Sequence, residues 1–579
     1  MQDHQPTTPL ERLRLKLARA DALVQLTMLG IVCGLLAGAV IIAFRLSLEQ
    51  LQVRLLVSHA EDYENLPWLE RFAWPALGGL ALGLLFQRLR GMPVGVVHVM
   101  ERLNYHRAVL PWRNAAVQFF AALVSIASGH SVGREGPGIH LGAWGGSILG
   151  GWLALPGNSL RTLVGCGVAA AIGASFNTPL AGVVFAMEVV LMEYSITGFA
   201  PVILAAVSGT ALTRLVYGPM PAFEVPPLEL GSVAELPYVL IIGILIGVLA
   251  AAFVRLITFV TLRTRAWPAV LRLTLAGVCT GALALPVPAI MGIGYDTVSG
   301  ALLGQLGLFA MLAVVLVKLL ATTVGIGLGL PGGLIGPTFV IGAAAGGAMG
   351  LIANALFPGD VSSHGFYAMV GMGAMMGATL QAPLAALIAM LELTGNPHIL
   401  LPGMLAVIAA GLTSSEGFRQ GPVFVSLLRT RGLDTRNDPV RQRLRRRGVE
   451  AVVDRRFLRA PRCLSRAAAE ALLAEAPHWL LVQDTEPPFA IPAADLARTL
   501  VADAAAQDVD LAGIASATRG PAVAVPLTAS LLDALEAMNS ADAELVYLTA
   551  PDRRGGERVC GVVPRQAIES EYRYNDRPL

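Results

Sequence analysis

The sequence predicts an all-α polytopic membrane protein, built as two repeats with broken helices in inverted topology, followed by a small α/β module. Of its 579 residues, 55% are hydrophobic and only 14% charged, with a mean hydropathy of +0.64. Soluble chains carry nearer a quarter charged residues. Apolar runs of about 20 residues, long enough to cross a bilayer as a helix, recur as far as Ser426. Two Gly- and Pro-rich breaks in these runs precede similar sequences, which predicts the repeat.

Residues 1–21 are polar and basic and are expected to form a cytoplasmic N-terminus. The basic run Arg12 to Arg19 precedes the first apolar run, and Arg441 to Arg447 follows the last one. Cytoplasmic flanks of membrane spans are enriched in Lys and Arg, so both termini are predicted to be cytoplasmic. The apolar run near residues 22–45 is too long for a signal-peptide core and is predicted to be the first span.

Residues 22–430 are predicted to form the membrane domain, with about ten or eleven helical segments. Several runs are short or interrupted by Gly and Pro, as in Gly327 to Pro337. Such segments make poor continuous spans but suit broken helices that meet at a buried site. The runs are expected to begin near Ala22, Phe72, Asn114, Leu160, Ile196, Pro237, Ala269, Leu306, Gly333, Gly365 and His398.

The membrane domain repeats itself. The segment GASFNTPLAGVVFAME (Gly173 to Glu188) resembles GATLQAPLAALIAMLE (Gly377 to Glu392). The motifs GREGP and GGLIGP, which end at Pro137 and Pro337, precede these segments at almost the same distance. Two homologous halves are therefore predicted, and halves of this kind often pack in inverted topology around a midplane site.

The two breaks predict an anion site. A helix that starts at a Gly-rich break presents free backbone N–H groups and the positive end of its dipole. Glu135 is itself an anion at such a start, so its carboxylate is expected to compete with a permeating anion and to leave when protonated. We expect such a gate to respond to pH. In the alternative, Arg134 and Glu135 pair at a membrane interface and merely finish a loop.

Three motifs, in this order and spacing, resemble the CLC family of chloride channels and proton/chloride exchangers: GREGP, FNTPLAG (Phe176 to Gly182) and PGGLIGP (Pro331 to Pro337). The resemblance covers roughly residues 25–430. It implies a homodimer in a cell membrane, with one pathway per subunit for chloride or a related small anion. The composition is compatible with a bacterial inner membrane.

By position, Glu135 corresponds to the gating glutamate of the family, within the anion-binding segment that also contains Gly133, Arg134 and Gly136. The resemblance implies that a central anion is held by the backbone amides of Leu334 and Ile335. Ile335 departs from the family's usual phenylalanine.

Two hydroxyl groups of the family's central anion site are missing. Val94 stands where the family has an anion-coordinating serine, and Phe424 stands where it has a tyrosine. A neutral hydrogen bond contributes about 1 kcal/mol net. We therefore expect weaker central binding or a different anion selectivity, with the amides supplying most of the coordination.

Val189 aligns with the internal proton-transfer glutamate of the exchangers, and Glu188 is its neighbour. Valine cannot relay a proton, so the resemblance favours a chloride channel, with a proton-coupled antiporter as the alternative. Glu188 and Glu392, at equivalent points of the repeats, either lie on a proton route or stabilise helix ends. Lys318, inside an apolar run, either faces an aqueous vestibule, where it raises the local anion concentration, or snorkels from a helix end.

Residues 431–454 are predicted to be a basic linker, and residues 455–579 a cytoplasmic pair of modules. The segments Pro461 to Asp484 and Val523 to Thr549 each have the pattern strand, helix, strand and resemble tandem CBS modules. Nucleotide-binding members usually carry a Thr three residues before an Asp. Here Pro492 precedes Asp495 at that spacing. A structural or dimer-supporting role is therefore favoured over nucleotide binding.

Several function classes are disfavoured. A net charge of +2 gives no electrostatic basis for nucleic-acid binding. The five cysteines lie far apart, without the spacing of a metal site or disulfide framework. The sequence has no HExxH and no paired aspartates, so an intramembrane enzyme is not expected. No cofactor is expected, with chloride as the ligand.

Overall fold

The computed structural model describes residues 23–56, 63–194, 196–356, 362–433, 444–445, 447–503, 507–514, 520–551 and 557–571. The chain forms two compact units. One holds Thr27–Leu149 and Arg161–Thr435; the other holds residues 23–26, Gly150–Leu160 and the described residues after Thr435. The basic run Arg12 to Arg19 lies outside the described residues, as do residues 441–443 and 446 of the second basic run.

The first unit is helical. Each of the eleven predicted runs contains a helix that starts within four residues of the expected position, and eight helices of the described chain are long and apolar enough to cross a membrane. Short helices between them, such as α4 and α12, were not predicted. The helices are α2 (Leu23–Leu56), α3 (Trp68–Arg88), α4 (Gly95–Tyr105), α5 (Trp112–Ala127), α6 (Glu135–Trp152), α7 (Gly157–Phe176), α8 (Pro179–Phe185), α9 (Ile196–Tyr217), α10 (Leu236–Thr264), α11 (Ala269–Ala284), α12 (Tyr295–Leu302), α13 (Leu308–Leu328), α14 (Ile335–Leu356), α15 (His364–Leu380), α16 (Pro383–Thr394), α17 (Leu400–Leu412) and α18 (Val423–Thr430).

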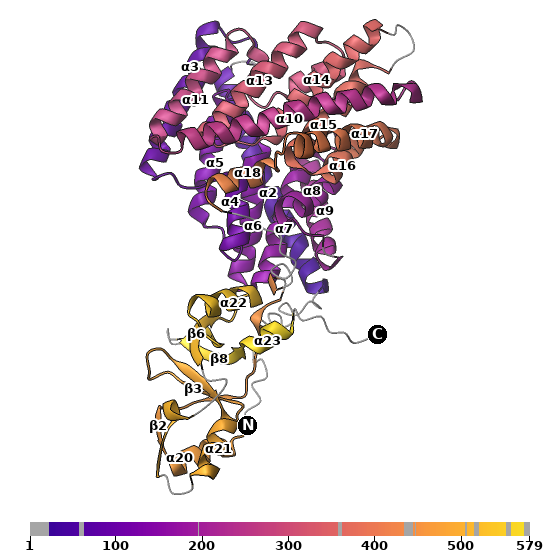
Figure 1. The fold of residues 1–579 in the computed structure, drawn as a ribbon. Coiled ribbons are helices and arrows are strands. Elements are labelled where there is room, and N and C mark those ends of the chain that lie inside the picture. Colours follow the sequence, from indigo (N-terminus) through magenta and orange to yellow (C-terminus); the bar gives the residue numbers. More distant parts are fainter. Residues whose placement is uncertain are drawn as a thin grey trace. The chain divides into compact units, whose positions relative to one another are not determined.

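Equivalent glycines bring equivalent helices together in the two halves. A side chain at Gly142 of α6 would meet the carbonyl oxygen of Gly167 in α7, and the reverse also holds. Gly342 of α14 and Gly371 of α15 approach each other in the same way, and these helices lie side by side in Figure 1. Because small residues let helix backbones approach closely in a membrane, both pairs pack tightly. The repeat predicted from the sequence is therefore present in the fold.

The broken helices also match between the halves. Helix α5 ends just before Gly129, with φ +82°, and α13 ends at Gly329, with φ +102°. Glycine adopts this left-handed conformation without a steric cost, which ends each helix. A short irregular segment then leads to α6 and α14. Irregular backbone at membrane depth is tolerated only inside protein, and residues 130–134 are all buried.

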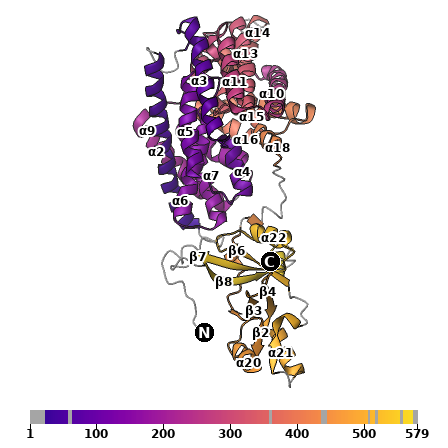
Figure 2. The same ribbon diagram turned by 90° about the vertical axis from the view of Figure 1, so that its left-hand side faces the viewer.

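The tail unit is a six-stranded sheet in the order β1-β3-β4-β6-β7-β8, with a separate pair formed by β2 and β5. Antiparallel pairing of β4 with β6 joins two similar halves, and Figure 2 shows β6, β7 and β8. The side chains of Ser465 and Ser530 accept hydrogen bonds from backbone amides in the first turns of α20 and α22 and so cap these helices. Both predicted strand–helix–strand segments are confirmed. The elements are β1 (Phe457–Arg459), β2 (Cys463–Ser465), α20 (Arg466–Ala474), β3 (Trp479–Val482), β4 (Phe489–Pro492), α21 (Ala493–Ala502), β5 (Asp508–Asp510), β6 (Gly520–Pro526), α22 (Leu531–Ser540), β7 (Leu545–Pro551), β8 (Glu557–Pro564) and α23 (Arg565–Ser570).

Candidate anion site at two helix starts

The two breaks meet in the interior of the membrane unit. The backbone N–H of Gly133 donates to the carbonyl of Gly333 at 2.8 Å, and Gly333 donates back to Gly133 at 2.7 Å. This bridge is antiparallel. A Cβ atom at Gly136 would lie 2.6 Å from the Cα of Gly333, so the approach requires glycine. The bridge holds the starts of α6 and α14 beside each other.

Glu135, the first residue of α6, is fully buried, and donors from the second half of the chain bind its carboxylate. Oε1 accepts a hydrogen bond from the hydroxyl of Tyr295. Oε2 accepts one from the backbone N–H of Gly336 at 3.2 Å. Gly336 lies in the first turn of α14, where N–H groups have no acceptor within the helix. The carboxylate therefore occupies the place where an anion would bind to this helix start.

Two glycines, which have no side chain, make room for the carboxylate of Glu135. A Cβ atom at Gly133 would overlap Oε2 of Glu135. A Cβ atom at Gly336 would lie 3.3 Å from the same oxygen. The oxygen thus sits in a small space that two glycines leave open.

Arg134 and Glu135 do not lie at an exposed loop end. Arg134 is 8% exposed, and its Nη2 donates to the carbonyl of Ser175 at 3.3 Å. Its guanidinium carbon lies 5.0 Å from the ring centroid of Tyr295, within range of a cation–π interaction. The interpretation of these residues as the end of an interfacial loop is therefore wrong.

Tyr295 is a site residue that the sequence reasoning missed. It is the first residue of α12, and its ring lies among aromatic side chains, 6.1 Å from Phe176 and 5.8 Å from Phe223 between centroids. Its contact with Glu135 spans 160 residues. The available signal was a phenol at the end of the glycine-rich turn GIGY, close in sequence to no other candidate.

Lys318 anchors the segment that leads to Tyr295. Its side chain is fully buried, and Nζ donates to the carbonyls of Ile290, Gly292 and Ile293 at 3.2, 3.3 and 3.2 Å. Backbone carbonyls thus compensate for the burial of an ammonium group at membrane depth. Lys318 therefore neither faces an aqueous vestibule nor snorkels to a surface, and both alternatives are wrong.

The positions assigned to the central anion lie on neighbouring elements. Leu334 and Ile335 are buried at the start of α14. Val94 immediately precedes α4, and Phe424, 5% exposed, lies in α18, which packs against α4. The first amide of α4, that of Gly95, donates to Oε1 of Gln118 at 2.6 Å. The participation of these residues in anion binding stays a prediction.

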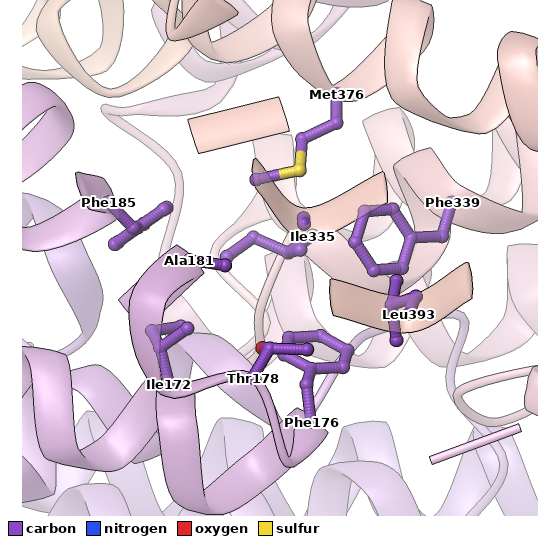
Figure 3. A pocket seen from close by; sticks show the side chains of 10 residues that line it. Ile172, Phe176, Thr178, Ala181, Phe185, Ile335, Phe339, Met376 and Leu393 are labelled. Carbon is purple, nitrogen blue, oxygen red and sulfur yellow. The ribbon is translucent and has the colours of Figure 1, made fainter. Parts of the chain in front are cut away.

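A small apolar pocket adjoins Ile335 (Figure 3). Phe176 and Phe185 from the first half and Phe339 from the second half contribute to its wall. Such a wall offers water few hydrogen-bond partners. The lining residues are Ile172, Phe176, Thr178, Ala181, Phe185, Ile335, Phe339, Met376, Ala389 and Leu393.

Glu188 and Glu392 cap each other's repeat. Glu188 accepts a hydrogen bond at 2.8 Å from the amide of Ala385, in the first turn of α16. Glu392, in α16, accepts one at 2.7 Å from the amide of Ala181, in the first turn of α8. A carboxylate at a helix N-terminus stabilises that helix. Val189 is 6% exposed and lies in the π-helical turn Ala186–Leu191 that follows α8.

Known proteins are similar in sequence to this chain along most of the membrane unit. A family model described as "Voltage gated chloride channel" matches residues 78–415. The putative chloride channel protein ClcB-like of Ralstonia nicotianae is 37% identical over 389 residues, which cover 64% of this chain and 90% of that protein. The H(+)/Cl(-) exchange transporter ClcA of Vibrio cholerae serotype O1 is 30% identical over 347 residues, 58% of this chain and 73% of the relative.

A solved structure extends the likeness in fold. The crystal structure of a eukaryotic CLC transporter superposes with a TM-score of 0.60 at 20% sequence identity. The superposition covers 94% of this chain and 98% of that chain. Coverage of this extent includes most of the tail unit as well as the membrane helices.

Proposed function

The chain belongs to the voltage-gated chloride channel (CLC) family, and from that premise we propose that it exchanges chloride for protons across a membrane. The observation that carries the proposal is the position of Glu135. Its carboxylate comes from one half of the chain and binds the helix start of the other half at Gly336.

Competition between two anions supplies the coupling. The ionised carboxylate fills the position at the start of α14, so a chloride ion entering that position displaces it. Protonation removes the charge that the helix dipole and the Gly336 amide attract, and the neutral side chain then yields to chloride. A transport cycle in which Glu135 alternately carries a proton and blocks the anion couples the two fluxes.

The names of relatives favour exchange over the channel expected from Val189. The ClcA protein of Vibrio cholerae is named an exchange transporter, and it matches 58% of this chain. A chloride channel stays the second candidate for two reasons. The side chain of Val189 has no ionisable group to relay a proton, and the relative from Ralstonia nicotianae is named a putative chloride channel protein. Exchange requires a proton route that does not use Val189.

We also propose that the protein is a homodimer in a cell membrane, with both termini in the cytoplasm. The eight membrane-length helices of the described residues support the membrane location. The tail is assigned as a CBS-like pair with a structural role. Its two similar halves, joined by the pairing of β4 with β6, support this assignment.

The test uses purified protein in liposomes loaded with high chloride, with chloride efflux and external pH recorded together. Exchange predicts that outward chloride flow drives protons inward against their gradient. Glu135→Gln should still pass chloride but move no protons. Electrogenic chloride efflux without proton movement in the wild type would instead establish the channel.

A further inference from the structure

We infer that the hydroxyl of Tyr295 is a ligand of the transported anion, at the position that Glu135 fills in this structure. The inference rests on the proposed competition between Glu135 and the anion. If the two compete for one position, each donor that binds the carboxylate is also a donor for the anion. The carboxylate has two such donors here, the Gly336 amide and the Tyr295 hydroxyl.

The hydroxyl can donate to an anion when Glu135 leaves. Tyr295 is 5% exposed, so this donor lies inside the protein and not at its surface. A dehydrated anion in the vacated position gains a hydrogen bond from it in a region of low dielectric. Hydrogen bonds to a charged partner are roughly twice as strong as neutral ones.

The space left by the carboxylate suits a small anion. Oε2 lies against Gly133 and Gly336, where a Cβ atom would crowd it. The bound carboxylate thus marks a position with one amide donor, one hydroxyl donor and bare glycine backbone. Neutral donors can hold an anion weakly enough for it to be released, as transport requires.

The hydroxyl is held in place independently of Glu135. The ring of Tyr295 lies beside Phe176 and Phe223, and the guanidinium of Arg134 lies over it at 5.0 Å. The preceding backbone is fixed by the ammonium of Lys318, which binds three of its carbonyls. The donor therefore remains aimed at the same point when the glutamate moves away.

Tyr295 also supplies a hydroxyl to a pathway whose expected hydroxyls are missing. Val94 and Phe424 occupy the positions of the two hydroxyl ligands that the family resemblance implies. In this chain the hydroxyl donor is therefore the phenol of Tyr295 beside Glu135, and not a side chain at the central position. The anion would then bind more strongly at the gate than at a central site built from amides.

The experiment measures chloride binding to purified full-length protein by isothermal titration calorimetry. Glu135→Ala empties the position, and Tyr295→Phe is added to it so that only the hydroxyl is lost while the ring stays. The matched control adds Tyr367→Phe to Glu135→Ala. The hydroxyl of Tyr367 also donates to a carboxylate, that of Glu235, but it lies outside the candidate site. Size-exclusion profiles confirm that each variant is folded.

In the Glu135→Ala background, Tyr295→Phe should weaken chloride binding by about tenfold or more, as loss of a hydrogen bond to a charged ligand predicts. Tyr367→Phe should leave the affinity unchanged within about twofold. An unchanged affinity with Tyr295→Phe would overturn the inference. A second pair of results would also overturn it: Tyr295→Phe tightens chloride binding when Glu135 is present and has no effect in the Glu135→Ala background. Tyr295 would then hold only the glutamate.

The role of Tyr295 and the proposed competition can fail separately. If Glu135→Ala binds chloride and the hydroxyl makes no difference, only the role of Tyr295 is lost. If folded Glu135→Ala binds no chloride, the proposed competition fails and the inference falls with it.

Discussion

A carboxylate oxygen of Glu135 lies 3.2 Å from the backbone nitrogen of Gly336, 201 residues further along the chain. This contact joins the two halves at the helix starts that the repeat places opposite each other. It also explains why an acidic residue stands in an apolar stretch. The carboxylate is bound by a helix start, where the protein offers partial positive charge without a full cation.

Gly333→Ala should separate the two helix starts. The new Cβ atom would lie 2.5 Å from the backbone nitrogen of Gly136, and backbone cannot move aside cheaply. We expect a loss of about 1–3 kcal/mol in stability, seen as a lower thermal midpoint in detergent, together with loss of chloride transport. Gly151→Ala in α6 is the control, because among the described residues no neighbouring element crowds its Cβ position, and it should not melt below the wild type. Equal melting of both variants would contradict the close contact.

Glu188→Gln and Glu392→Gln should behave alike. Each glutamate caps the first turn of a helix in the other half, so replacement by the neutral amide removes the charge–dipole attraction and costs about 1 kcal/mol. Thermal midpoints of the two variants should fall by similar amounts, and proton-coupled flux per folded protein should persist in both. Loss of proton coupling in Glu188→Gln alone would show that Glu188 relays protons.

Much of this arrangement could be predicted from the sequence. The part that could not be predicted has a physical cause. Hydropathy located the eleven runs, and the repeated motifs identified Glu135 and the helix start of α14. The sequence gives no sign of which donors meet which acceptors across the fold. Tyr295 was therefore missed, because its contact with Glu135 depends on how distant segments pack. The role of Lys318 was left undecided for the same reason, since its partner is the Ile290 carbonyl.

The reciprocal capping by Glu188 and Glu392 shows the same limit. The sequence placed the two glutamates at equivalent points and left open whether they serve a proton route or helix ends. The structure supplies their partners, the amides of Ala385 and Ala181. In the tail, local patterns sufficed to predict two strand–helix–strand segments because their strands and helices follow one another along the chain.

Phe424→Tyr should restore a hydroxyl to the predicted central anion position. Phe424 is buried in α18, beside the helix that Val94 precedes. A new hydrogen bond to the anion contributes about 1 kcal/mol, so chloride should bind about fivefold more tightly by calorimetry. Phe418→Tyr, at a side chain that is 48% exposed, is the control and should have no effect. No gain in affinity with Phe424→Tyr would place the central anion elsewhere.

Lys318→Met should loosen the segment that carries Tyr295. Methionine keeps the length of the side chain but leaves the carbonyls of Ile290, Gly292 and Ile293 without the ammonium donor. An unsatisfied buried carbonyl costs about 1–3 kcal/mol, so the thermal midpoint should fall and chloride affinity should drop with it. A variant that melts and binds chloride like the wild type would show that the ammonium does not organise this segment.

The most direct test of the central claim is anomalous X-ray diffraction from crystals of Glu135→Gln grown in bromide, compared with wild-type crystals grown in the same way. The account predicts a bromide peak within hydrogen-bond distance of the Gly336 nitrogen and the Tyr295 hydroxyl in the variant, and the Glu135 carboxylate at that position in the wild type. Bromide at that position beside an unmoved Glu135 in the wild type, or a variant with no bromide there, would contradict competition between the glutamate and the anion.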